Sequence, residues 1–257
     1  MAPRPLTTLR RWWYTPRIRS NLITTVLAVV TLGLCVVVAA WTRACANSAC
    51  PSIASLVREY DPAQASKVYA ADGRLITDLG AERRTVVSLE QISPAAVAAF
   101  VVVEDKRFYE HGGVDWVRAF GAVRHTLVYL LTGQGRVQGF STITMQLAGN
   151  LFPDEISRQD RTLKRKLREM HVAFEIEHNF AKGKVLEFYL NQINLGNGAF
   201  GVEAAAQRYF GKTARELNVA EAATLAGIPR SPTRYNPRRN PDFSVERRNL
   251  ILQLMAD

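Results

Sequence analysis

The longest apolar stretch of the chain covers residues 21–41 and contains no charged residue. It is about long enough to cross a bilayer as one helix. Arg17 and Arg19 are among the basic residues that precede it, so the positive-inside rule predicts a cytoplasmic basic tail over residues 1–20 and places the residues after Trp41 outside the inner membrane. A cleaved signal peptide is the alternative, but its apolar core is usually only ~7 to 15 residues long.

Beyond a linker at residues 42–60, the hydrophobic pattern predicts one mainly α-helical domain over residues 61–257. Residues 67–87 are the exception, because apolar alternation on both sides of Asp72-Gly73 predicts a β-hairpin. The segments expected to be helical are 94–110, 115–131, 142–151, 161–180, 184–193, 202–210, 220–226 and 244–256. Ser93 and Pro94 have the residue types of an N-cap and a first helical position, and Gly112-Gly113 is expected to end that helix.

The net charge of +10 predicts attraction to polyanions. A domain outside the inner membrane would not meet nucleic acid, so the basic surface is expected to face lipid headgroups or a phosphorylated lipid. Cys35 lies within the apolar span, and Cys45 and Cys50 follow it as either a small disulfide loop or two thiols. Without a CxxC pair or a Cys/His cluster, the sequence gives no sign of zinc.

An apolar run ends abruptly at Glu104 and Asp105. If the helix continues, Glu104, Phe108 and His111 share one face, and a carboxylate beside an aromatic ring suits a general base or acid. The alternative is an ordinary helix end with solvated acids, which the spacing alone favours.

Polar residues gather after a glycine-rich loop at residues 132–141, in the segment GFSTITMQLAGN. They could bind phosphate or sugar oxygens, although Ser and Thr are also common N-cap residues. The phosphate-loop pattern of nucleotide-binding proteins is absent, so no nucleotide cofactor is expected. The polar side chains concerned are Ser141, Thr142, Thr144, Gln146 and Asn150.

Residues 161–168 are strongly basic, and Arg165 lies one helical turn before Glu169. Arginine forks bind diphosphates well, whereas the alternative is a solvated face with ordinary helix salt bridges. His171, Glu175 and His178 also have helical spacing, but without an HExxH pattern we favour an ordinary helix surface over a metal site.

Four segments resemble, in order, the motifs of the family 51 peptidoglycan glycosyltransferases over roughly residues 60–257. They are EDKRFYEHGGVD, GFSTITMQLAGN, RKLRE and KVLEFYLNQINLGNGAFGVEAAAQRYFGK. The flanking segments are similar to those of class A penicillin-binding proteins. In that group a transpeptidase domain follows, which is absent here, so we expect the chain to be an N-terminal portion.

The resemblance implies a lysozyme-like, mostly α fold with a smaller membrane-abutting lobe. It implies that lipid II is polymerised into β-1,4-linked glycan with inversion, as undecaprenyl diphosphate is released. Glu104 matches the general base, and Glu169 matches a second acid that assists at the diphosphate, often with Mg²⁺ or another divalent cation. No organic cofactor is implied; the partners are lipid II, lipid-linked glycan, the membrane and cell-wall synthesis proteins. The residues that match substrate-binding positions are Asp105, Phe108, His111, Ser141, Thr142, Gln146, Asn150, Arg165 and Lys166.

Two positions depart from the family pattern. Met145 stands where the family usually has a glutamine, and Gly149 stands where it has a lysine that contacts the diphosphate. Losing a cation at a desolvated phosphate weakens binding or rate, and the candidates to compensate are Arg136, Arg158 and Arg161. Two alternatives therefore stay open, a catalytically weakened scaffold that binds lipid II, and a lytic transglycosylase or hydrolase of the same fold.

Overall fold

The computed structural model describes residues 16–46, 50–58, 60, 62–64, 66–80, 82–134, 139–157, 160 and 162–256. The chain divides into two compact units, residues 1–49 and residues 50–257. Most of the predicted basic tail lies outside the described residues.

The described part of the first unit is built on one long helix, α2 (Pro16–Ala44). Within it, Ser20–Ala44 is long and apolar enough to cross a membrane. The predicted apolar helix is confirmed and extends beyond residues 21–41 at both ends. Proline is tolerated at a first helical position, and the polar residues that flank the apolar stretch do not break a helix.

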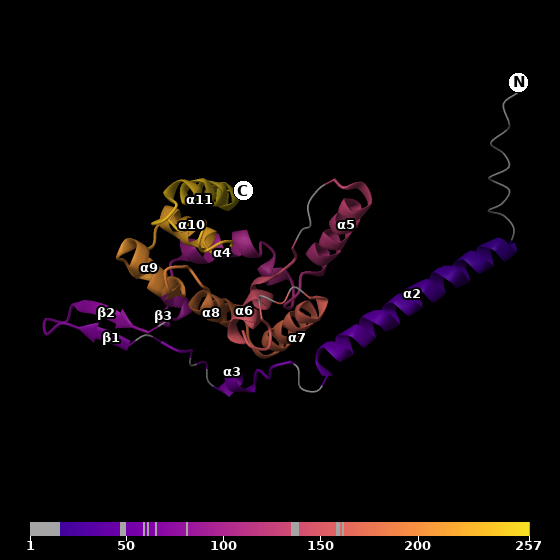
Figure 1. Ribbon diagram of the computed structural model, residues 1–257, viewed down its shortest axis with the longest axis horizontal. Helices are drawn as coiled ribbons and strands as arrows, with labels where there is room; N and C mark the ends of the chain where they lie inside the picture. The colour runs from indigo at the N-terminus through magenta and orange to yellow at the C-terminus, as the bar shows by residue number, and fades with distance from the viewer. Residues whose placement is uncertain are drawn as a thin grey trace, which may run out of the picture. The chain divides into compact units, whose positions relative to one another are not determined.

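The second unit is mainly helical, as predicted (Figure 1). Its described α-helices are α3 (Ala54–Arg58), α4 (Pro94–Glu104), α5 (Trp116–Thr132), α6 (Ile143–Leu151), α7 (Leu163–Asn179), α8 (Lys182–Gln192), α9 (Val202–Phe210), α10 (Val219–Gly227) and α11 (Pro241–Ala256). Short 3₁₀ segments cover Leu89–Gln91 (η2), Phe108–Glu110 (η3) and Ala214–Glu216 (η4). Helix α3 lies in the stretch predicted as a linker, where Ile53 and Leu56 join the core of this unit.

The predicted hairpin is confirmed. Strand β1 (Ser66–Tyr69) pairs antiparallel with β2 (Leu75–Leu79), and Gly73 between them has φ 82°, which a glycine adopts without strain. A second pairing was not predicted: β3 (Arg83–Arg84) runs parallel to β4 (Ala199–Phe200). These strands are two residues long and far apart in sequence, so no local alternation marks them.

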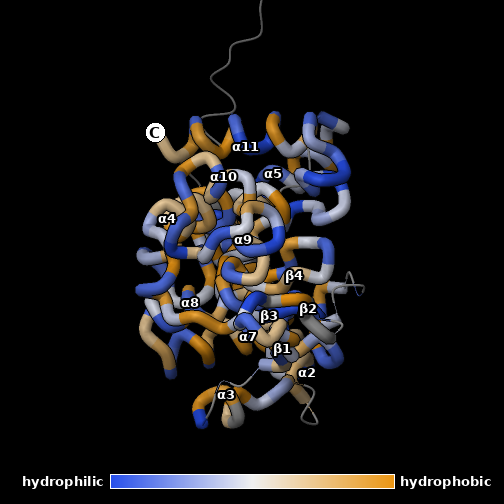
Figure 2. Tube along the Cα trace, turned by 90° about the vertical axis from the view of Figure 1, so that its left-hand side faces the viewer, coloured by the Kyte–Doolittle hydropathy of each residue, from blue (hydrophilic) through white to orange (hydrophobic). Residues whose placement is uncertain are grey.

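The core is centred on α8, whose side chains from Val185 to Leu190 are mostly buried. Helix α6 packs against α7 and α8, while α4 packs against α10 and α11. Figure 2 shows hydrophobic and hydrophilic positions alternating along α11, whose buried residues are Ser244 and Ile251. The two groups of helices meet where α4 ends.

Helix α4 begins as predicted but ends earlier. The Ser93 side chain accepts a hydrogen bond from the Ala96 N–H, and Pro94 occupies the first turn. The helix was expected to continue to residue 110, but it ends at Glu104 because Asp105 leaves the helical conformation, with φ −157° and ψ 73°. The prediction that Glu104, Phe108 and His111 share one helical face is therefore wrong.

Candidate active site

A polar cleft of about 470 Å³ lies in the second unit, where α4, α6, α7 and the α10–α11 region meet. Both acids singled out from the sequence, Glu104 and Glu169, line it. Its lining residues are Val103, Glu104, Arg118, Ser141, Met145, Gln146, Arg165, Glu169, Pro229, Arg230 and Arg247. Four arginines against two glutamates give this cleft a positive balance that suits an anionic ligand.

Glu104 is the last residue of α4 and is held from two sides. The Gln146 amide Nε2 donates to its Oε2 over 2.7 Å. Arg118 Nη1 donates to its backbone carbonyl over 2.9 Å, which satisfies one of the acceptors left open at a helix end. The carboxylate is therefore fixed in orientation and still borders the cleft.

Asp105 explains why the chain turns at this point. Its side chain is 1% exposed, and its Oδ2 accepts the backbone N–H of Ile143 at the start of α6. Both of its oxygens lie 3.1 Å from His111 Nε2. Beside this contact, the Thr142 hydroxyl donates to the Gly113 carbonyl over 2.6 Å. A buried carboxylate needs such partners, and here they tie the end of α4 to the start of α6.

Phe108 belongs to the core. Its ring is 0% exposed and meets the His111 ring edge-on, with centroids 6.4 Å apart, while Lys182 Nζ lies 4.2 Å from its centroid. Phe108 and His111 thus support the Asp105 turn from behind.

Glu169 lies on α7 and is 6% exposed. Its Oε1 accepts from Arg165 Nη1, and its Oε2 accepts from Lys166 Nζ over 2.9 Å. Lys166 also donates to the Ser141 hydroxyl over 2.6 Å. Burial lowers the pKa of the Lys166 ammonium, although the Glu169 charge opposes this shift. The contacts form a preorganised cationic group held on one buried carboxylate.

The two positions that depart from the family pattern lie on α6. Met145 is fully buried and borders the cleft. A Cβ built on Gly149 would lie 3.6 Å from Glu169 Oε1, which is ordinary van der Waals contact. A side chain at position 149 would therefore point toward the cationic group around Glu169. Arg136, Arg158 and Arg161, named above as compensating cations, lie outside the described residues.

The cleft brings some predicted residues together and leaves others behind it. Glu104, Ser141, Gln146, Arg165 and Glu169 line it; Asp105, Phe108, His111, Thr142, Asn150 and Lys166 do not. Sequence reasoning missed the lining residues Arg118, Arg230 and Arg247. Nothing in the local sequence sets these three apart from the other arginines of a basic chain.

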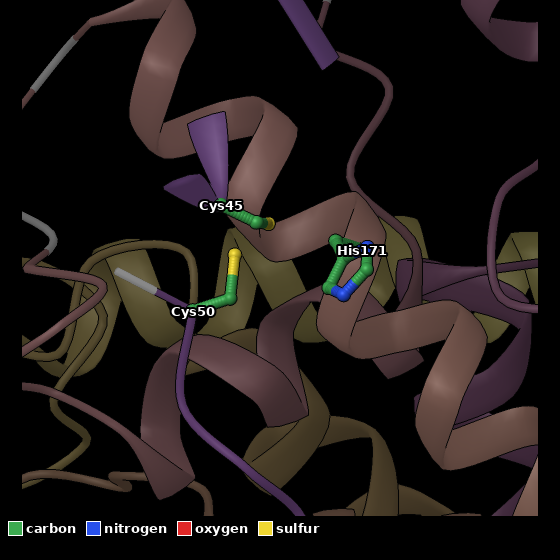
Figure 3. A group of neighbouring side chains, drawn as sticks. All are labelled: Cys45, Cys50 and His171. Atoms are coloured by element: carbon green, nitrogen blue, oxygen red, sulfur yellow. The ribbon is translucent and has the colours of Figure 1, made fainter. Parts of the chain in front are cut away.

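Of the residues whose helical spacing was considered for metal binding, His171 Nε2 lies 3.3 Å from Glu175 Oε1, while His178 is exposed. Figure 3 draws His171 together with Cys45 and Cys50. Both cysteines are disulfide-bonded, so of the two states left open by the sequence, a disulfide or two thiols, the structure has the disulfide. Cys35 is a free thiol. A sulfur in a disulfide is not a thiolate ligand, so we assign no metal site here.

The transglycosylase family model matches residues 72–256. Penicillin-binding protein 1A of Aquifex aeolicus is 47% identical over 202 residues, which cover 79% of this chain and 27% of that protein. The protein of the same name from Escherichia coli is 47% identical over 209 residues, covering 80% and 23%. Penicillin-binding protein 1A/1B of Bacillus subtilis is 43% identical over 191 residues, covering 74% and 20%.

The chain thus spans 20% to 27% of the length of these three relatives. A crystal structure of penicillin-binding protein 1A from Haemophilus influenzae matches with 28% identity and a TM-score of 0.41, covering 76% of this chain and 18% of that one. By the extent of the family match, the chain belongs to the transglycosylase family and carries the family 51 transglycosylase domain of a class A penicillin-binding protein.

Proposed function

We propose that this chain is a membrane-anchored peptidoglycan glycosyltransferase that polymerises lipid II. The observation that carries the proposal is a single cleft that holds Glu104, Glu169 and four arginines. In the proposed reaction the 4-hydroxyl of a lipid II acceptor attacks C1 of a glycan linked to undecaprenyl diphosphate. A β-1,4 bond forms with inversion, and the C1–O bond to the diphosphate breaks.

Glu104 is the base in this proposal. As the acceptor oxygen bonds to C1, its proton passes to the Glu104 carboxylate. Gln146 holds one carboxylate oxygen at 2.7 Å, and we assign the hydroxyl proton to the other. A base whose partners already fix its position loses little entropy on reaching the reactive geometry.

Arg165 and Lys166 neutralise the diphosphate that departs with the electron pair of the broken bond. The Arg165 guanidinium fork suits phosphate oxygens, while the Lys166 ammonium adds positive charge from behind the cleft lining. Glu169 holds both cations in place before substrate arrives. Such preorganised charge stabilises the developing anion without reorganisation during the reaction.

The resemblance also implied a divalent cation at Glu169. Both of its oxygens already accept from cations, and Mg²⁺ prefers a full shell of oxygen ligands. As arranged, Glu169 does not fit a resident Mg²⁺ site. No step above uses a metal, and the expected cation stays a prediction.

The apolar helix α2 supports membrane attachment of the enzyme. We infer from the basic residues before it that the N-terminus is cytoplasmic and the catalytic domain lies outside the bacterial inner membrane. Anchoring would confine the cleft to the layer that holds lipid-linked substrates. The expected partners are lipid II, lipid-linked glycan and other cell-wall synthesis proteins.

The test is incubation of the detergent-solubilised chain with labelled lipid II, with glycan resolved by gel electrophoresis. Wild type should form polymer, and Glu104→Gln should lower the rate by about 10²- to 10⁴-fold, the usual contribution of general-base catalysis. Glu246→Gln is the matched control, because Glu246 is an exposed glutamate on α11 that does not line the cleft. Lipid II binding without polymer would favour the scaffold, and cleavage of preformed glycan would favour the hydrolase.

A further inference from the structure

Helix α4 also forms the floor of a groove that shares no lining residue with the active-site cleft. This groove has a volume of about 710 Å³, and the α4 residues on its floor are Pro94, Val97, Ala98, Val101 and Val102. Their spacing is that of one stripe along a helix. Pro94 and Val102 are eight positions apart, so at a rise of about 1.5 Å per residue the floor is about 12 Å long.

The sequence of α4 is apolar on every side. Residues 94–103 include no polar side chain, and helices of this kind are normally covered all round. Ala99 and Phe100 are fully buried, whereas Pro94 and Ala98 on the groove floor are exposed. Within the described part of the chain, the groove side of α4 therefore lacks the apolar cover that its sequence favours.

The groove carries both signs of charge near the start of α4. Glu90 lies in η2 just before the helix, and Arg215 lies in η4. The Ser93 N–H donates to the Ala214 carbonyl over 3.0 Å, which holds η4 beside the first turn of α4. A carboxylate and a guanidinium at the same end largely cancel, so this end does not attract an anion strongly.

The other end of the groove is positive. Lys106 and Tyr109 line it just beyond the last residue of α4, and among the described residues Lys106 takes part in no ion pair. Tyr109 is 61% exposed, but its ring is held edge-on against the buried Phe108 ring, with centroids 5.1 Å apart. An ammonium and a phenol hydroxyl are both hydrogen-bond donors that suit a phosphate.

The positive end of the groove leads toward α5. Val102 and Lys106 also line a smaller hollow together with Val117 of α5. Val117, Phe120 and Leu131 of that helix are 64%, 71% and 76% exposed, and such a set of apolar side chains suits contact with lipid. The groove volume is that of a small-molecule site, which fits an acyl chain better than a folded partner.

We propose that the groove along α4 binds one acyl chain of an anionic phospholipid, with the lipid phosphate on Lys106 and Tyr109. The chain would lie along the valines of the floor, with its far end toward Pro94. Helix α2 is long and apolar enough to hold the protein in a bilayer, where such lipids are abundant. This lipid site is separate from the cleft and does not depend on the proposed function.

The test uses the full chain in phosphatidylcholine nanodiscs that contain a small fraction of a phosphatidylglycerol whose acyl chain carries a photoactivatable diazirine. Crosslinked peptides are identified by mass spectrometry. Wild type should be labelled over residues 94–109 as well as on α2, and labelling of α2 serves as the internal reference. A phosphatidylcholine probe with the same diazirine should label residues 94–109 about fivefold less, the usual effect of one lysine on an anionic lipid.

Three variants separate charge from shape. Lys106→Ala should lower groove labelling by the phosphatidylglycerol probe about fivefold, to the level of the phosphatidylcholine probe. Arg215→Ala is the matched control, since it removes a positive charge from the end that also carries Glu90, and it should keep the labelling. Ala98→Trp keeps every charge but fills the middle of the floor, so it should remove most groove labelling while α2 stays labelled.

Three results would overturn the proposal. One is labelling of α2 alone in wild type, which would point to a partner protein as the occupant of the groove. The others are equal effects of Lys106→Ala and Arg215→Ala, and unchanged groove labelling in Ala98→Trp.

Discussion

Gly149 is where this chain differs most consequentially from the pattern it resembles, and its surroundings make the difference measurable. It lies inside α6 and is buried, and a Cβ there would meet Glu169 Oε1 at 3.6 Å and Ile156 at 4.0 Å. One carbon fits without displacing its neighbours. Three substitutions separate the contributions: Gly149→Ala adds a Cβ, Gly149→Met adds length, and Gly149→Lys adds length and charge.

Two magnitudes decide the expected results. Replacing glycine by alanine inside a helix stabilises it by about 1 kcal/mol, so Gly149→Ala should raise the Tm by about 2–4 °C. A lysine cation near a phosphate oxygen gains up to about 4 kcal/mol at 4 Å with an effective dielectric constant near 20. Side-chain mobility and the cations already present reduce this gain. We therefore expect Gly149→Lys to polymerise lipid II about tenfold faster than Gly149→Met.

The lysine that raises the polymerisation rate should at the same time lower the thermal stability. Without substrate it adds a third cation beside Arg165 and Lys166, so Gly149→Lys should melt below Gly149→Met. The measurements are initial rates with labelled lipid II and thermal melts of the same detergent-solubilised samples. A lysine variant no faster than the methionine variant would refute the reasoning that position 149 faces the diphosphate.

Two further predictions concern pH and backbone strain. Because burial lowers the pKa of Lys166, its positive charge is lost at lower pH than that of a solvent-exposed lysine. Lys166→Arg should therefore extend polymerisation to higher pH, measured as a pH–rate profile. An unchanged alkaline limb of this profile would contradict the role of Lys166. Gly113 has φ 91°, and a Cβ there would lie 2.8 Å from the Ala173 carbonyl oxygen, so Gly113→Ala should destabilise the chain by about 2 kcal/mol in denaturant unfolding. Gly112→Ala, whose Cβ meets nothing within 4 Å, should change stability by less than about 0.5 kcal/mol, and equal effects would show that strain at residue 113 is unimportant.

Local signals predicted the start of α4, whereas α8 and α11 begin two and three residues before the predicted positions 184 and 244. Ser93, the N-cap expected from the sequence, accepts a backbone N–H of the helix that follows, and Asp115 and Thr142 do the same. The end of α4 could not be predicted in the same way. It depends on Asp105 bonding to Ile143 and His111, and only the folded chain brings the Ile143 N–H to that carboxylate.

Only the cleft residues that belong to recognisable sequence motifs could be predicted. Glu104 and Glu169 were named from local patterns and resemblance, and both border the cleft. Arg230 lies in a proline-rich loop and Arg247 on a terminal helix, where each looks like one basic residue among many. Their meeting depends on the packing of α10 and α11 against α4, which no local pattern encodes.

This packing has a consequence for how the domain folds. Helix α4, which carries Glu104, takes its main partners from α10 and α11 near the other end of the domain, and β3 likewise pairs with the distant β4. Contacts between segments so far apart form slowly, because a long loop must close before they stabilise the structure. During synthesis, Glu104 on α4 is therefore fixed only after α10 and α11 have formed and packed against α4. Folding intermediates should contain a formed α6–α7–α8 core while the cleft is still incomplete.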